Sequence, residues 1–329
     1  MSCQSIVHRA APRAALAGFA FALAACSSGS SSPSTSMAAP PLVTANAVST
    51  KAALNASSTE TIYVPSSAGD RVVSYNAHGQ PLLTISAGIN GPFGVAIDKT
   101  RKIYVTNTYP NNFTGNVTTY TSDGKQTTPT ITAGIDYPIG ITVNKSGNIY
   151  VVNLAGGNSE TGSVTTYKSD GTQTTPTITA GIDGPFGIAV DAKGKIYVAN
   201  LSSNSVTTYK PDGTQTTPTI TAGLQDVVAV AVDTNGKIYV ANARGGARNT
   251  GYVTTYEADG TQTTPTITAG IRTPVGVAVS TSGTIYVSNE IGPGDKGGFG
   301  SITTYTAEGQ RTTPTITKGL IQPQLITVH

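Results

Sequence analysis

The chain has 329 residues, and only 11% of them are Asp, Glu, Lys or Arg, against about 25% in an average soluble domain. The formal net charge of +3 is too small to indicate a protein that binds nucleic acid. Thr occurs 53 times, alongside 37 Gly and 19 Pro. Because Thr favours strands while Gly and Pro favour turns, the composition predicts an all-β protein and excludes a coiled coil.

Residues 1–25 are typical of a secretory signal, with a basic start and an apolar run too short to span a bilayer. The run ends in Leu23-Ala24-Ala25-Cys26, which resembles the lipobox of bacterial lipoproteins. The resemblance implies that Cys26 is lipidated and becomes the new N-terminus. The alternative is a plain secretory signal that contains an incidental Cys.

The residues after Cys26 bear on the location of the protein. Ser27 stands where an Asp would imply retention in the inner membrane of enteric-type bacteria, so we expect an outer-membrane lipoprotein of the cell envelope. Cys3 would leave with the signal, which makes a disulfide impossible in the mature chain. Residues 26–58 are rich in Ser, Ala, Pro and Thr, and this composition predicts a disordered tether.

The rest of the chain is a repeat. The tripeptide Ile-Tyr-Val begins at Ile62, Ile103, Ile149, Ile196, Ile238 and Ile285, at spacings of 41 to 47 residues. Each copy belongs to a unit of four short strand patterns, which in one unit are 187–191, 195–198, 206–209 and 217–221. Pro218 cannot donate to a strand ladder, so the fourth strand is the outer edge and the first is the innermost. Such four-stranded units of about 45 residues are typical of β-propeller blades.

The two ends of the repeat complete each other. No inner-strand pattern precedes the first Ile-Tyr-Val, and residues 323–329 form an inner-strand pattern with no second strand after it. We therefore expect the C-terminus to supply the inner strand of the first blade, which closes the ring. Residues 59–329 thus predict an all-β fold, a six-bladed β-propeller with four antiparallel strands per blade.

The unit resembles the NHL repeat. The matching residues in one unit are Pro185, Gly187, Ala189, Val190, Asp191, Gly194, Tyr197 and Val198. The basic residue that the family carries before its third strand is missing, and the Asp that ends its second strand is Asn here. NHL proteins, gluconolactonase-like proteins and streptogramin lyases share this broad architecture, and their functions run from RNA or protein binding to lactone hydrolysis and lyase chemistry. The resemblance therefore implies a fold and does not choose a function.

In a propeller, the loops between the second and third strands share one face with the connections between blades, and ligands usually bind there. From the Val of Ile-Tyr-Val to the next strand, the separations are 8, 12, 13, 8, 13 and 15 residues. Long variable loops on a rigid scaffold usually carry binding, although unconstrained drift is the alternative. The aromatic and charged residues of these loops are Tyr109, Phe113, Glu160, Arg244, Arg248, Glu290, Asp295, Lys296 and Phe299.

Two groups of residues are candidates for a site on this face. Arg244 and Arg248 are suited to an anionic ligand, unless they are simply solvated loop charges. An Asn ends the second strand in five units, at Asn107, Asn153, Asn200, Asn242 and Asn289. The gluconolactonase-like resemblance implies that such Asn residues hold a divalent cation, whereas a repeated Asn at a strand end also bonds its own loop backbone.

Catalytic residues are scarce. Glu290 is the only acid directly beside the Asn column, so we expect no metal site and no cofactor. After signal removal only His78 and His329 remain, and neither is placed to act as a general base. We expect a monomeric, lipid-anchored module that acts by binding rather than by catalysis, with a protein or glycan partner on the long-loop face. The alternatives are a cation-dependent enzyme of the lactonase or lyase type and a purely structural envelope protein.

Overall fold

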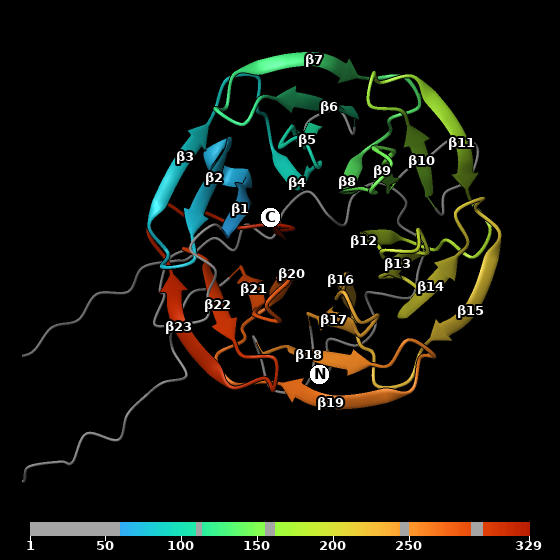
Figure 1. Ribbon diagram of the computed structural model, residues 1–329, viewed down its shortest axis with the longest axis vertical. Coiled ribbons are helices and arrows are strands. Elements are labelled where there is room, and N and C mark those ends of the chain that lie inside the picture. Colours follow the sequence, from blue (N-terminus) through green and yellow to red (C-terminus); the bar gives the residue numbers. More distant parts are fainter. Residues whose placement is uncertain (1–59, 110–113, 155–161, 244–249, 291–298) are drawn as a thin grey trace, which may run out of the picture. The chain divides into compact units, whose positions relative to one another are not determined.

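The computed structural model describes residues 60–109, 114–154, 162–243, 250–290 and 299–329. These residues form six four-stranded antiparallel sheets arranged in a ring (Figure 1). The predicted all-β, six-bladed β-propeller is therefore confirmed. The predicted signal, residues 1–25, and the predicted tether, residues 26–58, lie outside the described residues.

Each blade runs from an inner strand at the axis to an outer strand at the rim. Blade 1 is β24 (Thr327–Val328), β1 (Thr61–Ser66), β2 (Arg71–Asn76) and β3 (Pro81–Ile85). Blade 2 is β4 (Pro92–Ile97), β5 (Ile103–Tyr109), β6 (Thr114–Tyr120) and β7 (Gln126–Ile131). Blade 3 is β8 (Pro138–Val143), β9 (Ile149–Asn153), β10 (Ser163–Tyr167) and β11 (Gln173–Ile178).

The remaining blades follow the same order. Blade 4 is β12 (Pro185–Val190), β13 (Ile196–Asn200), β14 (Ser205–Tyr209) and β15 (Gln215–Ile220). Blade 5 is β16 (Val227–Val232), β17 (Ile238–Asn242), β18 (Tyr252–Tyr256) and β19 (Gln262–Ile267). Blade 6 is β20 (Pro274–Val279), β21 (Ile285–Asn289), β22 (Ser301–Tyr305) and β23 (Arg311–Ile316).

The ring closes through the C-terminal strand, as predicted. β24 pairs with β1, and Thr61 and His329 exchange two backbone hydrogen bonds of 2.9 and 3.0 Å. The regular strand is shorter than the predicted 323–329, because the N–H of Leu325 donates to the carbonyl of Phe93 in blade 2. The last residues of the chain therefore join blade 1 to blade 2 as well as completing blade 1.

Each residue of the recurring Val-Thr-Thr-Tyr in the third strand makes a distinct contact. In blade 4, Val206 is fully buried against blade 5 and Tyr209 is fully buried against blade 3. The hydroxyl of Thr208 donates to the carbonyl of Pro218 on the outer strand, at 2.8 Å. The hydroxyl of Thr207 accepts from the amide of Asn200, at 2.9 Å. The high Thr content therefore follows from hydrogen bonds that are copied around the ring.

The hydrophobic core is divided among the interfaces between adjacent blades, where the inner and second strands are almost entirely buried. Adjacent inner strands approach each other closely. A Cβ on Gly94 would lie 2.6 Å from the carbonyl oxygen of Ile139 in the next blade, so only Gly fits there. Nearby, the hydroxyl of Thr106 donates to the same carbonyl at 2.8 Å.

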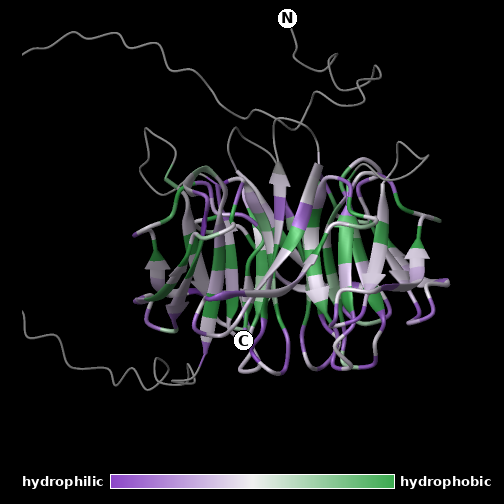
Figure 2. Cartoon of the chain, turned by 90° about the horizontal axis from the view of Figure 1, so that it is seen from above, coloured by the Kyte–Doolittle hydropathy of each residue, from purple (hydrophilic) through white to green (hydrophobic). Residues whose placement is uncertain are grey.

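The ring has two different faces, which Figure 2 shows edge-on. The loop face carries the loops between second and third strands and the connections between blades. The turn face carries the tight turns between inner and second strands and between third and outer strands. In the turn at Asp191, the side chain accepts the backbone N–H groups of Lys193 and Lys195 and lies 3.4 Å from the hydroxyl of Tyr197. The acids of these turns thus have a structural function.

Candidate functional site

The Asn column lies at the loop-face end of the second strands, with one residue in each of blades 2 to 6. All five side chains are fully buried. In blade 5, the amide oxygen of Asn242 accepts the backbone N–H of Gln225, at 3.0 Å. Its amide nitrogen donates to the carbonyl of Val240 and to the hydroxyl of Thr254, both at 3.1 Å. The side chain therefore ties the connection between blades to the third strand.

The other four Asn residues make the same pair of contacts. Each amide oxygen accepts a backbone N–H from the connection between blades, and each amide nitrogen donates to a third-strand Thr. The partner Thr hydroxyls lie 3.0 to 3.1 Å from a Tyr hydroxyl in four of the blades. These protein partners occupy both ends of the amides, which favours the structural interpretation of the column.

Two residues in each connection between blades have a positive φ, a Gly and, three positions later, a second residue. These second residues are Gly91, Tyr137, Gly184, Asp226, Thr273 and Gln322. Each carbonyl accepts the N–H of the residue that follows the Asn position in the same blade, as in the 3.0 Å bond from Glu290 to Thr273. A Tyr and a Thr are unusual at positive φ, and such strain is held only where the surroundings fix the backbone. The loop-face end of every inner strand is therefore rigidly placed.

This geometry places the second residue of the inner strand at its loop-face end in blades 2 to 6, and Gln324, which precedes β24, takes the corresponding place in blade 1. We call these six residues the mouth ring: Phe93, Ile139, Phe186, Val228, Val275 and Gln324. Five of them are apolar and belong to or pack against one cluster. The rings of Phe93 and Phe186 meet edge-to-face with centroids 5.2 Å apart, although blade 3 lies between their blades. The mouth ring thus forms a layer of mainly buried side chains at the loop-face end of the inner strands.

A second circle of residues surrounds the mouth ring. We call it the rim, and it consists of the residues after the Asn positions: Ser67, Thr108, Leu154, Leu201, Ala243 and Glu290. Leu154, Leu201 and Ala243 are half-buried and pack against the same apolar cluster. The rim therefore presents an apolar arc over blades 3, 4 and 5, packed on the same cluster as the mouth ring.

Glu290 is the charged member of the rim, and its carboxylate has no hydrogen bond or ion pair among the described residues. Burial raises the pKa of this carboxyl above its ordinary value. A carboxylate beside an apolar surface, without a partner, is suited to an incoming group that donates hydrogen bonds or carries a positive charge.

The other predicted site residues have different outcomes. Arg244, Arg248, Phe113, Glu160, Asp295 and Lys296 lie outside the described residues, and their roles stay predictions. Tyr109 ends β5 with its backbone paired to Thr114, and its side chain also lies outside the description. Phe299 is 56% exposed just before β22.

Sequence reasoning missed the mouth ring and Tyr137. Tyr137 is only 6% exposed and packs in the apolar cluster below the rim. The available signal was the recurring Pro-apolar pair that begins most inner strands, as in Pro92-Phe93 and Pro185-Phe186. Its meaning depends on the ring geometry, which brings one such apolar residue per blade to the axis.

The described residues contain no group of three or more His, Cys, Asp or Glu side chains arranged to hold a metal ion. Nor do they include a helix that is long and apolar enough to cross a bilayer. The Asn column, the mouth ring and the rim therefore offer hydrogen-bonded amides, apolar surface and one carboxylate. That chemistry is suited to contact with a partner surface.

Comparisons with known proteins agree with the fold. No protein-family model and no curated protein matches the chain. Among solved structures, a protein of unknown function from Bacteroides caccae is similar with a TM-score of 0.62 and 15% identity, over 82% of this chain and 98% of that one. A structure of a nidogen/laminin complex gives 0.61 and 16% identity, over 82% and 98%.

An enzyme is also among the similar structures. A catalytically inactive virginiamycin B lyase from Staphylococcus aureus, solved with quinupristin, gives a TM-score of 0.52 and 15% identity, over 71% of this chain and 73% of that one. At such identities the similarity shows the fold alone. The chain is a six-bladed β-propeller. The fold is shared by proteins of different function, so the function must be argued from the site.

Proposed function

We propose that the protein is a lipid-anchored binding module of the bacterial cell envelope, and that it holds a protein partner against the rim. The observation that carries this proposal is the apolar arc of the rim, which packs on a buried apolar cluster at the loop face. A partner that arrives there meets the partly buried side chains of Leu154 and Leu201, with Glu290 on the next blade but one of the same rim. Apolar anchors bordered by polar groups are typical of protein–protein contacts.

The rigid backbone beneath the rim supports this use. Each rim residue is held by a hydrogen bond from its backbone N–H to the connection between blades. Side chains on a fixed backbone lose less conformational freedom on binding, so more of the contact energy is retained in the affinity. The resemblance to NHL repeats agrees with the proposal, because that family includes protein-binding propellers.

A pull-down from envelope extract tests the binding face. The rim variant carries Leu154→Asp and Leu201→Asp, which place charge on the apolar arc. The matched control carries Thr130→Asp and Thr177→Asp on the exposed outer strands β7 and β11. We expect wild type and control to recover the same partner and the rim variant to lose it, with all three chains folded by circular dichroism. Equal recovery of the partner by the folded rim variant contradicts the proposal.

The anchor and the location form the second part of the proposal. They are supported by the sequence Leu23-Ala24-Ala25-Cys26 and by the Ser at position 27. Metabolic labelling with a fatty-acid analogue should label the wild-type chain and leave the Cys26→Ser chain unlabelled, and fractionation should place the labelled chain in the outer membrane. A wild-type chain that takes no label contradicts the anchor without affecting the binding face.

A further inference from the structure

The turn face is unevenly charged around the ring. The turns of blades 2, 3 and 4 form what we call the basic sector, which consists of residues 98–102, 121–125, 144–148, 168–172, 191–195 and 210–214. It contains nine Lys or Arg and five Asp. The corresponding turns of blades 5 and 6 contain one Lys and four acids. The face is therefore positive on one side and negative on the other.

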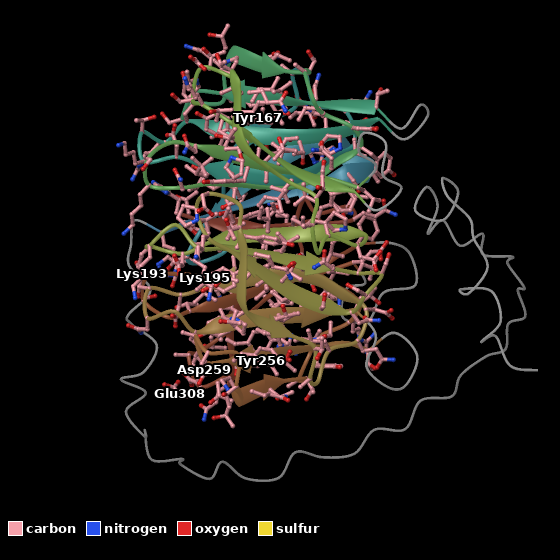
Figure 3. The ribbon with its side chains drawn as sticks, turned by 90° about the vertical axis from the view of Figure 1, so that its right-hand side faces the viewer. Tyr167, Lys193, Lys195, Tyr256, Asp259 and Glu308 are labelled. Atoms are coloured by element: carbon pink, nitrogen blue, oxygen red, sulfur yellow. The ribbon has the colours of Figure 1, made fainter. Side chains whose placement is uncertain are left out.

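Most of the positive charges of the basic sector are exposed, as are three of its five Asp. Its exposed lysines are Lys99, Lys125, Lys145, Lys168, Lys193 and Lys210, of which Lys125 pairs with Asp123. Lys195 instead lies over the ring of Tyr197 and donates to the carbonyl of Thr217. Asp98 is buried and accepts hydrogen bonds from its own turn. In Figure 3, Lys193 and Lys195 lie along the same edge of the ring as Asp259 and Glu308 of the acidic side.

The N-terminal part of the chain joins the propeller on this same face. Thr61, at the start of β1, exchanges backbone hydrogen bonds with His329. His329 follows the inner strand β24, and Asp98 follows the inner strand β4 at a tight turn of the turn face in the same way. Residue 60 therefore lies on the turn face. The proposed lipid attachment at Cys26 is 34 positions earlier in the sequence. The mouth ring and the rim lie at the opposite ends of the strands.

We propose that the basic sector lies against the anionic headgroups of the membrane that carries the lipid anchor, so that the loop face points away from the bilayer toward the partner. The orientation rests on the lipid anchor proposed above, whereas the affinity of the basic sector for an anionic surface does not. Basic side chains near such a surface each strengthen binding by roughly fivefold. The attraction acts within about 10 Å, so it fixes orientation only when the tether already holds the protein near the bilayer.

The affinity is tested without the anchor. The chain from residue 26 onward, with Cys26→Ser, is mixed with vesicles of phosphatidylcholine alone or with 30% phosphatidylglycerol. We expect binding to the anionic vesicles that falls as salt rises, and roughly tenfold or more weaker binding for Lys145→Glu/Lys193→Glu. The control Arg272→Glu/Lys318→Glu makes the same change in net charge on the loop face. Equal loss in both pairs, or no binding to anionic vesicles, overturns the proposal.

The orientation is tested with the acylated full chain in anionic vesicles. A fluorophore is attached at Ser146→Cys on the turn face or at Ser202→Cys on the loop face, both exposed positions, and quenched by headgroup-labelled lipid. We expect strong quenching at position 146, weak quenching at position 202, and loss of this difference in Lys145→Glu/Lys193→Glu. Equal quenching in the wild type overturns the orientation, while failure of the chain to float with the vesicles refutes the anchor instead.

Discussion

Glu60, at the seam where the first and last blades meet, offers a prediction about pH and stability. Its side chain is 7% exposed, and neither carboxylate oxygen makes a hydrogen bond of standard geometry. The hydroxyls of Ser280 and Tyr286 in blade 6 lie beside it. In blades 2, 4 and 5 the corresponding Tyr faces an Asp of its own blade, at 3.1 to 3.4 Å. In blade 6, Ser280 stands at the position of this Asp, and Glu60 of the neighbouring blade supplies the carboxyl group beside Tyr286 instead.

Burial raises the pKa of Glu60 above its ordinary value, and the two hydroxyls only partly offset this. The folded protein therefore holds the proton to a higher pH than the unfolded chain does. The contribution to stability is complete below the unfolded pKa and is lost as pH rises through the folded pKa. A buried carboxylate without a hydrogen bond of standard geometry costs about 1–3 kcal/mol. Glu60→Gln should therefore raise the free energy of unfolding by about 1–3 kcal/mol at pH 8 and change it very little at pH 4.

Urea unfolding followed by circular dichroism between pH 4 and pH 8 measures the effect. For a domain of this size, 1 kcal/mol corresponds to a Tm shift of about 2 °C. The control Glu308→Gln removes an exposed carboxylate on the turn face and should change little. The reasoning is refuted if Glu60→Gln is less stable than wild type at pH 8, because ionised Glu60 would then be stabilising Tyr286.

Three further results are expected from the fold and the site. Asn242→Ala should lose about 2 kcal/mol or more in urea unfolding, because the N–H of Gln225 loses its buried acceptor; unchanged stability would contradict the structural role of the column. Deleting residues 322–329 should lower the Tm of the whole domain, and a wild-type Tm would disprove closure by β24. Metal analysis of the full chain should find no stoichiometric calcium or zinc; a bound ion released by Glu290→Gln would favour the cation-dependent enzyme.

The blades could be predicted from the sequence because their determinants are local and repeated. Six copies of Ile-Tyr-Val set the period, and prolines such as Pro218 placed the outer strand at the edge. The inner-strand pattern at the C-terminus predicted how the ring closes. These features depend on strand chemistry within one unit, and the closure follows from counting which strands lack a partner.

The site was less predictable, because it depends on contacts between blades. The sequence left two interpretations of the Asn column open, and the deciding partner, a Thr on the third strand, was visible only as part of Val-Thr-Thr-Tyr. The contact between Phe93 and Phe186 joins blades that are not neighbours. Glu60 belongs to no repeat unit, so no pattern linked it to Tyr286. The predicted role of Arg244 and Arg248 in binding an anionic ligand remains a prediction.

The two faces of the propeller are tested most directly by photo-crosslinking in living cells. A photoreactive amino acid replaces Leu201 on the rim or Lys193 in the basic sector of the acylated chain. We expect the probe at position 201 to crosslink to a protein and the probe at position 193 to crosslink to lipid. A protein adduct at position 193 together with none at position 201 would contradict the proposed binding face.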